Sequence, residues 1–267
     1  MANAVIYDLA ALAAMVPAAL VTLRREGGRD AVYGLALAAA VAGPVALSAL
    51  LLAGSWQTSL SIALWVSVAV SMVLFAGLAA VTAQGWRLTP LLVPYLAGLG
   101  LIATIWQTAP GHPLTADAPA AWVQFHILVS VTTYGLLTIA AVAALAAFLQ
   151  ERALKNRKRQ GVLTRLLPSI ADSERLSGRL LLACESVLGL GLASGMALQY
   201  LETGVLLRVD HKTLLSLMAF AVIGLLLVAN RLVGMRGRAA ARLVLLAYLL
   251  LTLAYPGVKF VTDVLVH

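Results

Sequence analysis

Eight apolar stretches recur along the chain, and most are long enough to cross a lipid bilayer as a helix. Such a crossing takes roughly 20 residues, and only helices or closed barrels pair all their backbone polar groups there. Hydrophobic residues make up 62% of the 267 residues and charged residues only 11%, which excludes an ordinary soluble domain. We therefore predict an all-α, polytopic integral membrane protein forming one transmembrane domain over residues 1–267. The predicted spans are 4–23, 31–53, 60–81, 91–106, 122–149, 180–200, 213–230 and 243–264.

The basic residues are distributed unevenly between the two sides of this predicted bundle. Sixteen of the 19 Lys and Arg residues follow the first, third, fifth or seventh span, and only Arg208, Lys212 and Lys259 lie on the other side. The positive-inside rule places the long basic connection 150–179 in the cytoplasm and both termini outside. The net charge of +8 is explained by this topology, so it does not indicate nucleic-acid binding.

One ionisable residue, His126, stands inside the fifth apolar span, in the run AWVQFHILVSVTTYGLLT. On a helix, Ser130 and Thr133 fall within about 40° of His126, and Trp122 lies one turn above it. This polar stripe is expected to face the other helices. Two interpretations remain open: a packing histidine bonded to a neighbouring helix, or a ligand to a metal or cofactor.

A second group of polar residues opens the seventh span, in LRVDHKTLLSLMAF. Asp210 is placed to act as the helix N-cap. Lys212 is either a solvated interfacial residue or a partner for an anionic group near the positive end of the helix. With His211 between them, these residues suit haem, because its iron takes imidazole and its propionates are bound by cations and N–H donors.

Other kinds of chemistry find no support in the sequence. The single cysteine, Cys184, excludes a disulfide framework and a dithiol redox pair within this chain. No pattern indicates a nucleophile with its base, a nucleotide-binding loop or a hydrolytic metal site. We therefore expect that the chain does not act as an enzyme by itself.

The second half of the chain resembles the cytochrome c assembly family of haem-handling membrane proteins. The run HILVSVTTYGLLTIAAVAALAAFLQ is similar to the family helix that starts with an external haem-ligand histidine followed eight residues later by tyrosine, matched by His126 and Tyr134. The segment LLPSIADSERL resembles the small eight-helix branch of YpjD-like and HemX-like proteins, matched by Pro168, Glu174 and Arg175.

Two later segments extend this resemblance, which covers about residues 122 to 267. DHKTLLSL is similar to the Asp-Pro-Lys end of the family's tryptophan-rich external motif, with His211 in place of the proline. GMRGRAAARL resembles the Gly-Trp-Arg-Gly-Arg-Arg signature, with Met235 in place of the tryptophan. His267 corresponds to the family's second external histidine, one residue out of register.

The chain also departs from the family pattern at informative positions. Where haem-attaching members carry tryptophans, this chain has Thr203, Leu207 and Val209, so it lacks an aromatic platform for stacking on haem. Val228 replaces a histidine inside the seventh span. The resemblance therefore implies a reduced branch that handles haem without attaching it.

From the residues and the resemblance together, we expect a bacterial inner-membrane protein that binds or handles haem at its external face. It would support cytochrome c biogenesis or haem homeostasis, with haem, the lipid bilayer and other cytochrome c maturation or haem-synthesis proteins as partners. The expected iron ligands are His126 and His211, and the wider cofactor site adds His267, Asp210, Lys212, Trp122 and Tyr134. Two alternatives remain open. One is a non-haem transporter or accessory subunit, and the other is a membrane-bound regulator of haem synthesis.

The predicted topology is testable with reporter fusions. Reporters fused after His267 should report the external side, and reporters inserted within 155–160 should report the cytoplasm, because 16 of the 19 basic residues lie on that side. A cytoplasmic signal from the His267 fusion would contradict both the topology and the shared outer position of the histidines.

Overall fold

The computed structural model describes residues 2–24, 29–53, 57–108, 112–113, 119–155, 161–205 and 210–261. Eight helices in these ranges are long and apolar enough to cross a membrane, which confirms the predicted number of spans. They are built on α1 (Ala2–Arg24), α2 (Ala31–Leu52), α3 (Leu60–Val81), α4 (Thr89–Ile105), α5 (Ala120–Lys155), α7 (Ile170–Thr203), α8 (His211–Val233) and α9 (Gly237–Thr252).

Short elements connect or extend the spans. The 3₁₀ helix η1 (Gly85–Leu88) leads into α4, and α6 (Val162–Leu166) lies between α5 and α7. After α9 the chain continues as the π-helix η2 (Leu253–Gly257) and α10 (Val258–Phe260). The two-residue strands β1 (Gln57–Thr58) and β2 (His112–Pro113) pair antiparallel and join two loops at one end of the bundle.

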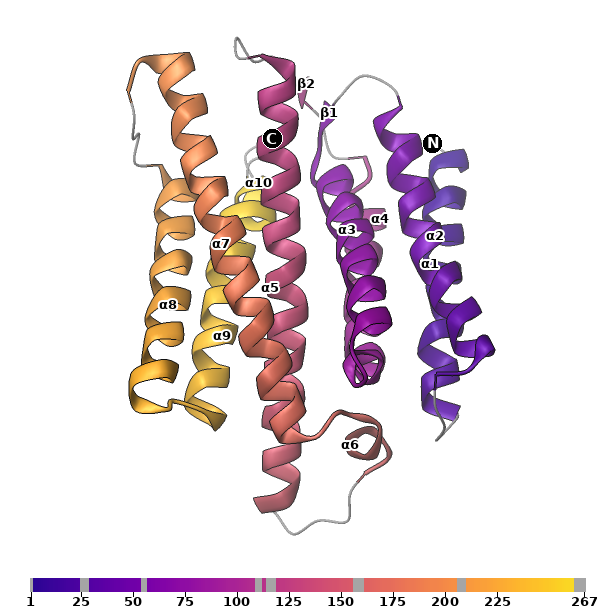
Figure 1. Ribbon diagram of the computed structural model, residues 1–267. Coiled ribbons are helices and arrows are strands. Elements are labelled where there is room, and N and C mark those ends of the chain that lie inside the picture. Colours follow the sequence, from indigo (N-terminus) through magenta and orange to yellow (C-terminus); the bar gives the residue numbers. More distant parts are fainter. Residues whose placement is uncertain are drawn as a thin grey trace.

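The spans run alternately up and down, with α5 at the centre (Figure 1). Helices α1 and α2 form one side of the bundle, α8 and α9 form the other, and α7 packs along α5. The number of spans is even, so the beginning of α1 and the short helix α10 lie towards the same end of the bundle. Helix α6 lies at the opposite end (Figure 1). Which end faces the cytoplasm stays a prediction from the charges.

Several helices extend beyond the apolar stretches that marked them in the sequence. Helix α7 begins at Ile170 and not at residue 180, and its N-cap Ser169 accepts a hydrogen bond from the Asp172 backbone N–H. Helix α5 continues to Lys155, and α9 already begins at Gly237. The apolar pattern predicts the part of a helix that lies in hydrocarbon, whereas capping and charged turns continue the helix into water.

How much of each helix is buried depends on its position in the bundle. Most of α5 is buried, whereas most apolar side chains of α1 and α8 are at least partly exposed at the periphery. Exposed leucines such as Leu35 and Leu225 fit a lipid surface, where association depends on close packing and not on expulsion of water. At the contact between α1 and α2, a Cβ added to Gly43 would lie 2.8 Å from Ala14 Cβ and 3.2 Å from the Ala11 carbonyl oxygen.

We predict that Gly43→Ala destabilises the protein by on the order of 1–3 kcal/mol, because the added methyl group forces α1 and α2 apart. The matched control is Gly34→Ala on the same helix, where nothing lies within 4 Å of an added Cβ. The control should be neutral or slightly stabilising, since alanine is the better helix former. Thermal unfolding in mild detergent measures both, and equal unfolding temperatures would contradict the proposed close contact.

Candidate functional site

His126 lies half-buried between α5 and α7, near the end of the bundle where α5 begins. Its Nδ1 is 2.8 Å from the hydroxyl oxygen of Ser194 on α7. The Ser194 side chain is buried and also donates to the Gly191 carbonyl oxygen at 3.0 Å. The histidine is therefore fixed by a neighbouring helix.

The two hydrogen bonds of Ser194 can form at the same time with only one tautomer of the neutral His126 ring. A serine hydroxyl carries one proton, and here that proton is donated to Gly191. Ser194 must then accept from His126, so Nδ1 carries the imidazole proton. The lone pair of the neutral ring therefore lies on Nε2, the atom that can bind a metal. A second hydrogen bond that fixes the tautomer in this way is typical of metal-ligating histidines.

Small residues on α7 make room for the imidazole. A Cβ added to Gly195 would lie 3.0 Å from His126 Cε1, and one added to Gly191 would lie 3.4 Å from Val129 Cγ1. Two glycines four residues apart are typical of a close contact between membrane helices, and here they lie against α5. Because Gly195 has no side chain, the His126 ring lies directly against the backbone of α7.

An aromatic pair lies beside His126 near the start of α5. The indole N–H of Trp122 donates to the Ser194 carbonyl oxygen at 3.4 Å. The Trp122 ring is tilted by 44° against Phe125, with the ring centroids 5.9 Å apart. Trp122 is 39% exposed and Phe125 44% exposed, so both rings offer apolar surface to a ligand or to lipid.

The other two residues of the predicted polar stripe, Ser130 and Thr133, are half-buried and buried. The Thr133 side chain donates to the Val129 carbonyl oxygen at 2.8 Å. Cys184 of α7 donates to the Thr133 carbonyl oxygen at 3.6 Å. These residues satisfy backbone groups inside the bundle and connect α5 with α7.

Tyr134 lies apart from His126, in a cluster of tyrosines in the core. Its hydroxyl is 3.0 Å from that of Tyr248 on α9, which also bonds Tyr95, and its ring lies 6.3 Å from that of Tyr255. Eight residues along a helix correspond to about 12 Å and turn the side chain by about 80°. Tyr134 therefore packs against other helices, and its role towards a cofactor stays a prediction.

The first turn of α8 holds the other predicted site residues. Asp210 is the N-cap and its Oδ1 accepts from the Thr213 backbone N–H at 2.7 Å, which confirms the predicted cap. His211 and Lys212 are exposed beside it. No contact between described residues joins His211 to His126, and His267 lies outside the described residues.

His126 is the donor that the structure describes at this place, and it offers one imidazole. Among the described residues, no group of three or more His, Cys, Asp or Glu side chains could hold an ion. A haem iron receives four nitrogens from its own macrocycle and needs only one or two axial ligands from the protein. His126 by itself could supply one such ligand.

Comparison with known proteins identifies the family. The family model described as cytochrome C assembly protein matches residues 32–266. This chain belongs to the cytochrome c assembly protein family. An uncharacterized 28.8 kDa protein in the nifR3-like 5' region of Azospirillum brasilense is 55% identical over 270 residues, covering 99% of each chain. No solved structure matches this chain.

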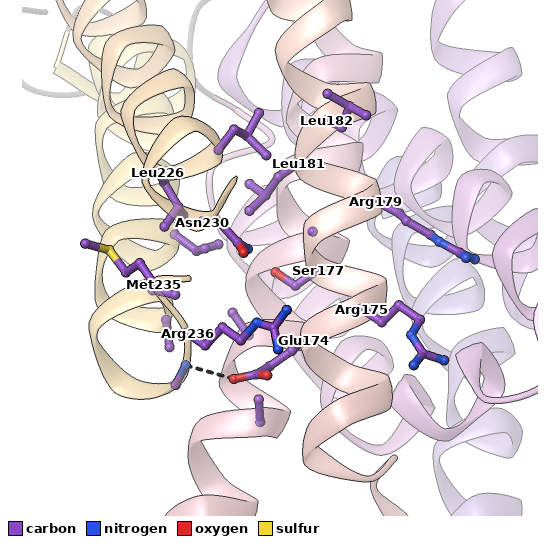
Figure 2. A pocket seen from close by; sticks show the side chains of 18 of the residues that line it. Glu174, Arg175, Ser177, Arg179, Leu181, Leu182, Leu226, Asn230, Met235 and Arg236 are labelled. Carbon is purple, nitrogen blue, oxygen red and sulfur yellow. Dashed lines mark hydrogen bonds between the residues drawn. The ribbon is translucent and has the colours of Figure 1, made fainter. Parts of the chain in front are cut away.

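Two segments that carried the family resemblance meet at the opposite end of the bundle. Glu174 Oε1 accepts a hydrogen bond from the Gly237 backbone N–H at 2.8 Å (Figure 2). Gly237 has a φ of 66°, a left-handed conformation that favours glycine. The hydrogen bond joins the beginning of α7 to the beginning of α9.

Sequence reasoning missed Ser194, which organises the His126 site. The available signal was a polar residue beside Gly195 on the small-residue face of α7, because a hydroxyl on a close-packed face is placed to bond across the contact. The sequence does not show which helix Ser194 contacts.

We predict that the His126 ring is protonated at Nδ1 when neutral. In ¹⁵N NMR spectra of histidine-labelled protein, the resonances missing from His126→Gln identify this ring, and its Nε2 should give the unprotonated signal. Ser194→Ala should shift the ring towards a mixture of tautomers, because Nδ1 loses its acceptor. The matched control Ser186→Ala changes a serine on α7 that bonds its own helix, and should leave the spectrum unchanged. A protonated Nε2 in the unsubstituted protein would contradict the assignment.

Proposed function

We propose that this protein binds or passes haem at the outer end of its bundle, in support of cytochrome c biogenesis or haem homeostasis. One observation carries the proposal: Ser194 of α7 hydrogen-bonds Nδ1 of the His126 ring, which leaves Nε2 as the nitrogen that can bind iron. Membership of the cytochrome c assembly family supports a haem-related role. In a bacterium the corresponding location is the inner membrane, with both termini outside.

Each residue near this end has a definite task in the proposal. His126 would be the principal axial ligand, and His211 or His267 would supply the second. Haem, when bound, supplies an iron with open axial positions for imidazole. The exposed cation of Lys212 and the N-terminal N–H groups of α8 would bind the propionates. Trp122 and Phe125 would cover apolar parts of the macrocycle.

The missing tryptophans favour handling of haem over its attachment to another protein. Thr203, which stands where haem-attaching members carry a tryptophan, is exposed at the end of α7 and donates to the Gln199 carbonyl oxygen. A small hydroxyl side chain offers no stacking surface. We therefore assign partner proteins, such as other cytochrome c maturation or haem-synthesis proteins, the steps that follow binding.

We predict that His126→Ala nearly abolishes haem binding, because it removes the ligand that α7 holds in place. His211→Ala and His267→Ala are the matched comparisons, and the one that removes the second ligand should leave a five-coordinate or solvent-ligated iron. Ser194→Ala should weaken binding by roughly 10–100-fold, the usual cost of losing the group that orients a ligand. Absorbance of bound haem is measured on protein purified in mild detergent, after normal membrane levels are verified.

Two results would argue against this function. If His126→Ala retained full haem with an unchanged spectrum, His126 would be a packing histidine. If the unsubstituted protein from haem-replete cells showed no Soret absorbance and took up no added haem, the haem proposal would fall. A transport or regulatory role would then be favoured.

A further inference from the structure

A cavity of about 420 Å³ lies at the end of the bundle opposite His126. Helices α5, α7, α8 and α9 and the connection between α8 and α9 enclose it (Figure 2). Alanines make up much of its wall, and these small side chains leave the helices unable to fill the space between them. They are Ala144, Ala147, Ala171, Ala240 and Ala241.

More arginines than acidic residues line the cavity, so its described lining carries a net positive charge. Arg231 and Arg236 line it from the end of α8 and from the following connection. Neither forms an ion pair or hydrogen bond with any described residue. The only acidic lining residue is Glu174, and its Oε1 already accepts from the Gly237 backbone N–H.

The two arginines of α7 that contribute to the lining have a different orientation. Figure 2 shows Arg236 beside Glu174 and Ser177, between α7 and the α8–α9 connection. Arg175 and Arg179 instead point across α7, away from that connection. Their stems contribute wall atoms while their guanidinium groups lie outside. Arg236 is therefore a cation that lies on the cavity side of α7, and Arg231 lines the same cavity from the end of α8.

The remaining wall is apolar and leads towards the lipid-facing side of the bundle. Leu182, Leu226, Leu227 and Val244 line this part, and Leu182 is 49% exposed. Asn230 adds a neutral polar side chain between the leucines and the arginines. A small water-soluble anion would leave the leucines uncovered, whereas a molecule with an anionic head and a hydrocarbon chain covers both parts.

We infer that this cavity binds the phosphate headgroup of an acidic phospholipid. Arg231 and Arg236 bind the phosphate oxygens, Asn230 donates a neutral hydrogen bond, and the start of an acyl chain lies along Leu182 and Leu226. Guanidinium groups bind phosphate well because their N–H donors match its oxygens in pairs. Basic pockets between membrane helices are typical sites for anionic headgroups. This site is independent of haem and of His126.

The test measures which lipid stays bound to the purified full-length protein. The protein is equilibrated with equal amounts of phosphatidylglycerol and phosphatidylcholine in detergent, and bound lipid is counted by native mass spectrometry. The unsubstituted protein should retain phosphatidylglycerol preferentially. The double variant Arg231→Gln/Arg236→Gln should lose this preference by on the order of tenfold, since each cation near an anionic headgroup contributes a severalfold preference.

The matched control is Arg175→Gln/Arg179→Gln, which removes the same charge from arginines that point away from the cavity. It should keep the preference of the unsubstituted protein. Equal losses in the two double variants would overturn the inference, because they would show general surface attraction and no built site. If the first double variant does not reach the membrane, Arg231→Gln and Arg236→Gln are each compared with Arg175→Gln, and the same rule applies.

A second arm separates a lipid from a soluble phosphate. Inorganic phosphate and glycerol phosphate are added at millimolar concentration to the protein with bound phosphatidylglycerol. The bound lipid should remain, because neither compound covers the leucine wall. Displacement of the lipid by either compound would overturn the lipid assignment in favour of a soluble phosphate ligand.

Discussion

Hydrocarbon offers no hydrogen-bond partners, and this constraint governs both the fold and the site. Each span is helical because a helix pairs its own backbone groups. Once expulsion of water no longer drives helices together, close packing through small residues takes its place. Gly43 brings α2 against α1, and Gly195 brings α7 against the ring of His126. The glycine that allows the helix contact is thus also the residue that makes space for the imidazole.

The same constraint explains why the polar side chains form small, closed groups. His126, Ser194 and Trp122 share hydrogen bonds across the α5–α7 contact. Tyr134 and Tyr248 bond each other deeper in the bundle. A polar group left alone in lipid is costly, and at these two places the polar side chains have partners on another helix. At the His126 site this pairing also leaves one ring nitrogen with a lone pair.

The two ends of the bundle offer opposite kinds of chemistry. The His126 end presents a neutral imidazole and aromatic surface, and the other end presents arginines around a cavity of about 420 Å³. The basic residues after alternate spans follow from topology. The packing of α7, α8 and α9, which includes the hydrogen bond from the Gly237 N–H to Glu174, makes four arginines line one cavity. A topological signal thereby becomes a binding surface for an anion.

Much of the fold was predictable because it depends on local properties of the chain. Eight apolar stretches gave eight spans, and Asp210 before an apolar run gave a helix cap. The early start of α7 at Ile170 was not predicted, because hydropathy records contact with lipid and the first turns of this helix lie outside it. The site was predictable only in part. His126 stood out as an ionisable residue inside a span, whereas Tyr134, paired with it by the family pattern, packs elsewhere.

The sequence by itself determined which segments cross the membrane, the side on which their charges gather and the histidine that most needs a partner. These follow from hydropathy, charge and helical spacing, which act over a few turns. Only the tertiary structure decided that Ser194 is that partner, that Nδ1 is the ring nitrogen bonded to it, and that Arg231 and Arg236 line one cavity. The physical reason is that these relations join residues tens of positions apart. Which helices come together depends on the complementary shapes of their surfaces, and no local pattern in the sequence records that complementarity.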